Sequence, residues 1–254
     1  MFGDTTKTGT PSRSSALEGR FDAGDHKLYL KCTGNGSPTV VYLHSAVLQA
    51  GDPGHEQAGR VPSLLDDRYR VCVYDRANVG RRDKVPGRLT GDDSVRDLHA
   101  LLGSAGVEGP YVLFGPTTGG AIADLYAARY PRDVVGMTLL AATLPTYPEI
   151  GAVARPGDWR TEAERLDRLA TLRQVARVQG QRRKTPVTYI HAAVSRPLRV
   201  EAAMRRAQRA FIARFSPGRL VVVSGVPVPH DMAASIPERV AREVDRVIRT
   251  ARKR

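Results

Sequence analysis

The chain has 254 residues, 41% of them apolar, and no run approaches the roughly 18 consecutive apolar residues that a membrane-spanning helix needs. Two cysteines exclude a disulfide-rich scaffold and a cysteine-based metal cluster. The polar N-terminal segment has no apolar core of a secretory signal, so we expect a cytoplasmic protein without a membrane partner.

The formal net charge is +13, and much of it falls in one region. Between Arg160 and Arg214, lysine and arginine outnumber aspartate and glutamate by 10. Such a surface attracts an acidic substrate, an acidic carrier protein or nucleic acid, although arginine-rich helices also carry charge simply as a solvated surface. No RNA-binding signature or zinc-finger spacing accompanies the charge, so we expect no nucleic-acid partner.

Strand patterns and helical patterns alternate after a polar segment, residues 1–16, that is typical of a flexible tail. The predicted strands are His26–Cys32, Thr39–Leu43, Val71–Tyr74, Tyr111–Phe114, Val135–Leu140, Val187–Ile190 and Leu220–Val223. The predicted helices are Asp93–Ala105, Ala121–Tyr130, Glu162–Gln179, Val200–Arg214 and Pro237–Ala251. Continuous apolar strands between amphipathic helices indicate an α/β fold with a mostly parallel sheet covered on both faces.

Two local features refine this organisation. The turn residues 34–38 predict an antiparallel hairpin between the first two predicted strands. Cys32 and Cys72 lie in strand-like runs, where we expect buried free thiols, with a bridge between neighbouring strands as the alternative. Prolines and an arginine-rich helix interrupt the strand pattern at 146–183, which predicts a small helical lid over the carboxyl ends of the strands.

Residues 111–120 are the most informative stretch. An apolar run enters a turn with glycines at 115 and 119, and a helical pattern leaves it. This strand–turn–helix context is that of the nucleophile elbow, whose usual form is Gly-x-Ser-x-Gly. Thr117 stands in the place of the serine.

Further landmarks occur in a consistent order along the chain. They are Val40–His44, Arg70–Asn78, Asp97–Leu102, Gly109–Leu113, Tyr126–Pro131 and His230-Asp231 followed by Pro237-Glu238. With the elbow they make the chain resemble the α/β-hydrolase superfamily over residues 20–254. The resemblance implies an eight-stranded sheet, with a core formed by residues 17–145 and 184–254 and a lid at 146–183.

The resemblance also implies a set of site residues. Thr117 takes the nucleophile place, where its branched side chain crowds the turn, and His230 takes the place of the base. Backbone N–H groups of Thr118 and of the loop Ser45-Ala46 would form the oxyanion hole. His44 and His191 lie where they could face the pocket.

The acid of the usual triad has no evident counterpart. Ala141-Ala142-Thr143 follows one candidate strand, and residues 191–196 after the next contain no carboxylate. Asp167 or Glu164 could substitute, or could make surface salt bridges instead. The glycines of 115–120 lack the spacing of a dinucleotide loop, and the sequence has no metal-ligand cluster, so we expect neither a cofactor nor a metal.

These substitutions leave three functions open. The first is a non-hydrolytic enzyme that uses His230 and a carbonyl-polarising pocket for epimerisation, isomerisation or cyclisation of a small or peptide natural product. The second is an ester or amide hydrolase that uses Thr117 and His230. The third is a non-catalytic protein that binds a ligand in the pocket.

Overall fold

The computed structural model describes residues 16–46, 52–80, 83–148, 150, 155–157, 160, 163–181, 183–194, 196–226 and 231–254. Eight strands of this part form one sheet in the order β1-β2-β4-β3-β5-β6-β7-β8. Their bounds are β1 Leu17–Asp22, β2 Lys27–Thr33, β3 Thr39–Tyr42, β4 Val71–Tyr74, β5 Tyr111–Pro116, β6 Val134–Leu140, β7 Val187–Ala192 and β8 Gly218–Val223. The predicted eight-stranded, mostly parallel sheet is confirmed.

The sheet begins antiparallel and continues parallel. β1 pairs with β2 and β2 with β4 in antiparallel register, whereas the ladders from β4 through β3 to β8 are parallel. The predicted hairpin between β2 and β3 is wrong, because β4 lies between them. The true hairpin joins β2 to β1, whose alternation of half-buried and exposed residues is too weak a hydrophobic signal to predict a strand.

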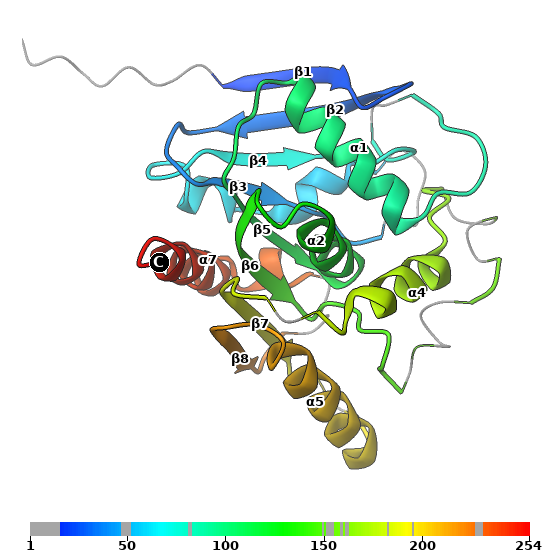
Figure 1. Ribbon diagram of the computed structural model, residues 1–254, viewed down its shortest axis with the longest axis vertical. Coiled ribbons are helices and arrows are strands. Elements are labelled where there is room, and N and C mark those ends of the chain that lie inside the picture. The colour runs from blue at the N-terminus through cyan, green and yellow to red at the C-terminus, as the bar shows by residue number, and fades with distance from the viewer. Residues whose placement is uncertain are drawn as a thin grey trace, which may run out of the picture.

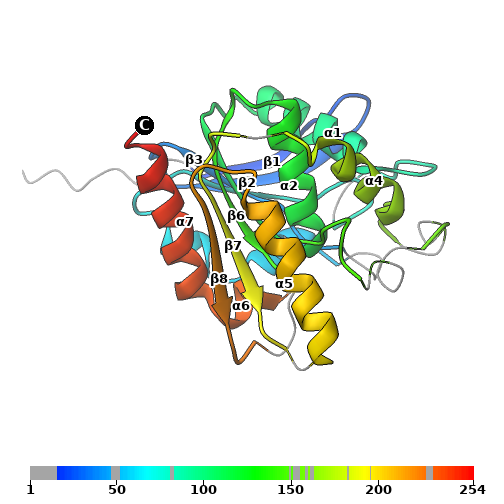
Figure 2. The ribbon, with the colours of Figure 1, turned by 60° about the horizontal axis from the view of Figure 1, so that its bottom comes forward.

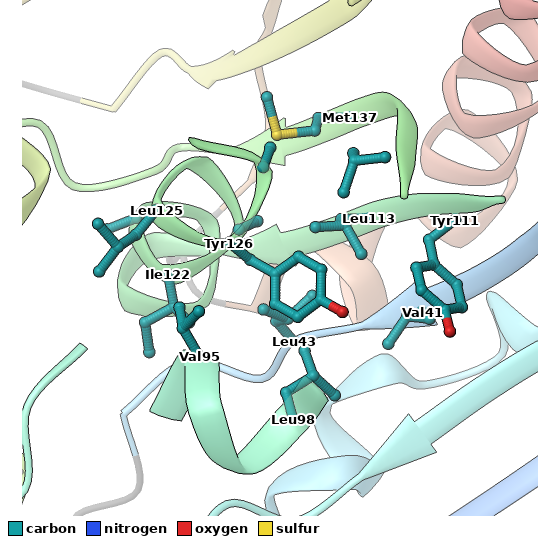
Figure 3. Close-up of a cluster of buried hydrophobic side chains, with 14 of the residues drawn as sticks. Val41, Leu43, Val95, Leu98, Tyr111, Leu113, Ile122, Leu125, Tyr126 and Met137 are labelled. Atoms are coloured by element: carbon teal, nitrogen blue, oxygen red, sulfur yellow. The ribbon is translucent and has the colours of Figure 1, made fainter. Parts of the chain in front are cut away.

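Helices cover both faces of the sheet (Figures 1 and 2). One face carries α1 Gly91–Ser104, α2 Thr117–Arg129, α4 Arg168–Val178 and α5 Leu198–Ile212. The other carries α7 Pro237–Ala251, with the short helices η1 Gly54–Ala58, η2 Pro62–Leu64 and α6 Met232–Ser235 packed near it. Two hydrophobic clusters fill the layers, and the larger one joins α1 and α2 to the sheet through Leu98, Leu113 and Tyr126 (Figure 3).

The two cysteines form a disulfide, so the expectation of free thiols is wrong. Cys32 of β2 and Cys72 of β4 face each other in the antiparallel register, and their Sγ atoms are 2.05 Å apart. The alternative of a bridge between neighbouring strands is the one that the structure has. Sequence reasoning paired β2 with the wrong strand, so it could not place the two cysteines opposite each other.

The helical part of the predicted lid is shorter than expected. Its helix begins at Arg168 rather than Glu162, and α4 packs against α1 and α2 on one face of the sheet. Residues 149, 151–154, 158–159, 161–162 and 182 of the lid segment lie outside the described residues. In the described part of the chain no helix is long and apolar enough to cross a membrane.

Candidate active site

The predicted elbow lies between β5 and α2, at the carboxyl end of the central parallel strands. Thr117 has φ +41°, the left-handed region that β-branched residues avoid. A Cβ at Gly115 or Gly119 would lie 2.3 or 2.0 Å from the carbonyl oxygen of Leu43. Glycine is therefore required at both positions because the turn packs directly on the backbone that follows β3.

The hydroxyl of Thr117 is hydrogen-bonded to the hydroxyl of Ser45, and either oxygen can be the donor. Ser45 is only 6% exposed. On the other side of the elbow, the N–H of Thr143 donates to the carbonyl oxygen of Thr117 (3.1 Å). Thus the structure places the hydroxyl of Thr117, at the start of α2, against the hydroxyl of Ser45, in the loop after β3.

His44 and the backbone of Ser45 are held rigidly. His44 is fully buried; its Nδ1 lies 2.6 Å from the carbonyl oxygen of Ser45, and its Nε2 lies 3.1 Å from the N–H of Arg76. The N–H of Arg76 can only donate, so His44 is the Nδ1–H tautomer. Burial lowers the pKa of His44 well below its usual value, with the charge of Arg76 acting in the same direction. Both ring nitrogens are therefore engaged by backbone groups, one of Ser45 and one of Arg76.

The buried ion pair of Arg76 and Glu164 also holds the loop that follows β3. The guanidinium of Arg76 donates to the carbonyl oxygens of His44 (2.7 Å) and Ser45 (3.0 Å), and its Nε donates to Glu164 (2.5 Å). Arg76 and Glu164 are 2% and 1% exposed. Glu164 thus positions the β3 loop through Arg76. This ion pair is buried, so Glu164 does not make the surface salt bridge that was the alternative.

The predicted oxyanion donors differ in availability. The N–H of Ser45 donates to the side-chain oxygen of Gln57 (2.9 Å) and is therefore occupied. Thr118 is the second residue of α2, where no intrahelical carbonyl accepts its N–H. Ala46 is half-buried at the end of the same loop, and residues 47–51 lie outside the described part of the chain. Sequence reasoning missed Gln57, because its contact joins two residues that are twelve positions apart in the chain.

Asp167 caps a helix. Its carboxylate accepts from the N–H of Ala170 (2.7 Å) at the start of α4, and Arg88 lies 3.4 Å from its second oxygen. An aspartate at this position satisfies a free N–H of the first helical turn. The structure therefore places Asp167 in a capping role, with its oxygens directed to α4 and Arg88.

His191 lies in a buried polar network under α5. Its Nε2 is 2.8 Å from Glu201, and its Nδ1 is 2.8 Å from the side-chain nitrogen of Gln208. Gln208 also donates to Tyr147, whose hydroxyl meets that of Tyr189. Burial lowers the pKa of His191, against the opposing effect of Glu201. His230, the predicted base, lies outside the described residues.

The model of the alpha/beta hydrolase fold family matches residues 38–196. With the strand order and the elbow described above, this shows that the chain belongs to the α/β-hydrolase family. The crystal structure of an epoxide hydrolase from Vigna radiata superimposes with a TM-score of 0.72 at 15% identity, covering 95% of this chain and 100% of that one. A thermophilic esterase from Thermogutta terrifontis gives a TM-score of 0.62 at 20% identity, covering 94% and 99%.

Sequence relatives match over shorter stretches. The bifunctional esterase/perhydrolase DCH of Acinetobacter calcoaceticus is 29% identical over 109 residues, 43% of this chain and 38% of that protein. The proline iminopeptidase PfmaB of Pestalotiopsis fici is 26% identical over 131 residues, 51% and 45%. An uncharacterized Bacillus subtilis protein, YqjL, is 34% identical over 80 residues, 32% of each. These matches span less than half the length of each relative.

Proposed function

We propose that the chain is an enzyme that binds a carbonyl compound over Thr117 and moves a proton on it, without hydrolysis. The substrate class is a small molecule or peptide, and the outcome is epimerisation, isomerisation or cyclisation. The main support comes from three features of the elbow and its surroundings. The backbone of Thr117 has the left-handed conformation, its hydroxyl is hydrogen-bonded to Ser45, and neither candidate acid position, 141–143 or 191–196, contains a carboxylate.

In this mechanism the N–H of Thr118 and the one hydroxyl proton that the Ser45–Thr117 hydrogen bond leaves free face the substrate carbonyl. Their hydrogen bonds stabilise the negative charge that develops on the carbonyl oxygen when the neighbouring C–H bond breaks. The proposed base, His230, accepts that proton and returns it to the same carbon or to another one. No bond to Thr117 forms and no water enters, so the reaction needs no charged triad acid.

The test is solvent deuterium incorporation. N-acyl amino-acid thioesters and short peptides are incubated in D2O with the full chain, with Thr117→Ala and with His230→Ala, and products are read by mass and by chirality. We expect deuterium at the carbon next to the carbonyl and no cleavage, with loss in His230→Ala. Thr143→Ala is the control hydroxyl deletion, since Thr143 contacts the elbow through its backbone. Cleavage without exchange contradicts the proposal.

A second candidate is an ester or amide hydrolase that uses Thr117 with His230. The retained left-handed backbone at Thr117 favours it, because that conformation presents the side chain at the top of the sheet. Relatives that carry the names esterase/perhydrolase and proline iminopeptidase also favour it. An adduct of Thr117 with a fluorophosphonate would distinguish it from the first candidate.

We also propose that the substrate or its carrier is acidic. Arg199, Arg206 and Arg209 are exposed on α5, and Arg173 and Arg177 are exposed on α4. A substrate on an acidic carrier protein would meet these helices with complementary charge, so its turnover should fall as salt is raised.

A further inference from the structure

A second group of titratable side chains lies where β1 and β2 meet the Pro53–Ala58 segment. It surrounds a cavity of about 390 Å³ lined by Glu18, Tyr29, His55, Glu56 and Asp75, together with Pro53 and Gly80. This volume is within the range of small-molecule sites. None of the elbow residues lines it, and the ring of His44, against which Gly54 packs, lies next to this segment.

The centre of this cluster is a histidine held by a buried carboxylate. Both the backbone N–H (2.8 Å) and the Nδ1 (2.9 Å) of His55 contact the same oxygen of Asp75. Asp75 is 1% exposed. A carboxylate can only accept, so the neutral imidazole carries its proton on Nδ1, and Nε2 is left as a hydrogen-bond acceptor.

The carboxylate of Asp75 is closed off on its other side. Gly80 has φ +62°, and a Cβ there would lie 2.1 Å from Oδ2 of Asp75. Among the described residues, His55 is the ion-pair partner of Asp75. In the described part of the chain no lysine or arginine pairs with Asp75, so a cation beside His55 would stabilise this buried carboxylate.

The rest of the lining also accepts hydrogen bonds. Tyr29 donates its hydroxyl to Glu18 (2.8 Å), and Lys31 pairs with the other oxygen of Glu18 (3.0 Å). Glu56 has no ion-pair partner among the residues that the structure describes. The rings of Tyr29 and His55 are 4.7 Å apart. A ligand that donates hydrogen bonds and carries positive charge therefore complements Nε2 of His55 and the carboxylates of Glu56 and Asp75.

A second cavity, of about 370 Å³, shares His55 and Glu56 with the first. Its lining also includes Lys31, which pairs with Glu18 and leaves Glu56 as the unpaired carboxylate among the described lining residues. The apolar side chains that line it are Ala58, Pro62, Val71 and Val73. The two cavities together thus offer an anionic part and an apolar part on either side of His55.

We propose that this cleft is a second ligand site, which takes a small organic ammonium ion: the ammonium N–H donates to Nε2 of His55, Glu56 and Asp75 balance its charge, and its apolar substituent lies against Val71 and Val73. The site goes beyond the proton-transfer function proposed above and does not depend on it. Its negative lining is opposite in sign to the net charge of +13 of the chain, which gives it selectivity for cations over the rest of the surface.

The test uses long-range 1H–15N spectra of the full chain labelled with 15N-histidine, titrated with n-butylammonium. We expect His55 in the Nδ1–H tautomer and a saturable shift of its Nε2. Methylammonium should bind more weakly, because it lacks the apolar chain. Removing one carboxylate in Glu56→Gln should weaken binding about threefold or more, as expected for a partly exposed ion pair.

The matched controls are n-butanol, Glu108→Gln and Thr117→Ala. Glu108 is an exposed carboxylate outside both cavities, so its variant should bind butylammonium as the wild type does, and so should Thr117→Ala. The proposal is overturned by the Nε2–H tautomer, by an equal shift with n-butanol, by equal affinity in Glu56→Gln and Glu108→Gln, or by no saturable shift. A loss in Thr117→Ala would mean that the cleft depends on the elbow, which also contradicts it.

Discussion

At the residue scale, Thr117 combines a branched side chain with a backbone angle that disfavours it. Left-handed backbone costs an L-residue on the order of 1 to 2 kcal/mol, and such strain persists mainly at functional positions. The surrounding contacts, from Leu43 to Thr143, hold the turn in this form. The strain therefore supports the proposal that the elbow is a functional site.

Thr117→Gly should consequently leave the free energy of unfolding unchanged or raise it by up to about 1 kcal/mol, because glycine adopts positive φ without strain. Thr118→Gly, one residue further into α2, should lower it by about 1 kcal/mol. The measurement is the free energy of unfolding in urea of each variant, compared with that of the wild type. Destabilisation of Thr117→Gly by as much as Thr118→Gly would contradict the strain assignment.

Sequence reasoning identified the elbow because glycines and a strand–helix transition are local signals. It could not identify the partners of the elbow, because these depend on the path of loops. Gln57 occupies the N–H of Ser45, and Glu164 reaches the same loop through Arg76. Neither contact has a spacing that a sequence pattern records.

At the element scale, glycines set how closely α2 approaches the backbone after β3. Gly119→Ala would place a Cβ 2.0 Å from the carbonyl oxygen of Leu43, so we expect a loss of about 1 to 3 kcal/mol from overpacking. Gly103, near the end of α1, has no atom within 4 Å of a Cβ. Gly103→Ala should therefore gain about 0.5 to 1 kcal/mol from helix propensity. Thermal unfolding measures the change in stability for Gly119→Ala and for Gly103→Ala. Similar changes in the two variants would contradict the close approach of α2 to the backbone after β3.

Hydrophobic periodicity predicted which segments are helices and which are strands, but it did not predict which strands are neighbours in the sheet. Val71–Tyr74 and Pro237–Ala251 have the predicted bounds, because each has a strong apolar pattern of the right period. β1 was missed, and the turn at 34–38 was assigned to a hairpin that β4 interrupts. Pairing depends on long-range contacts, so the Cys32–Cys72 bridge followed from the fold and not from the cysteine spacing.

At the scale of the whole molecule, Asp97, a half-buried carboxyl on α1, makes the free energy of unfolding depend on pH. Burial raises the pKa of Asp97 from 3.8 to about 6, although His26 and Arg96 act against this. Between these two values the folded chain holds a proton that the unfolded chain has lost. Asp97 therefore makes stability fall as pH rises from about 4 to about 6, with no further change above.

The check is the difference in free energy of unfolding between the wild type and Asp97→Asn, measured by urea across about pH 4 to 7. The variant cannot titrate at this position, so the difference isolates Asp97. We expect the wild type to lose stability relative to the variant as pH rises through this window. The opposite slope would mean that the contact with His26, at 3.4 Å, outweighs the burial.

We propose above that Thr117 lies in a retained site without acting as a hydrolytic nucleophile. The most direct measurement is intact mass after exposure to a reactive fluorophosphonate, with activated-ester turnover measured in parallel for the wild type, Thr117→Ala and His230→Ala. We predict no adduct and no ester turnover. A single adduct on Thr117 that requires His230 would contradict the claim and establish the chain as a hydrolase.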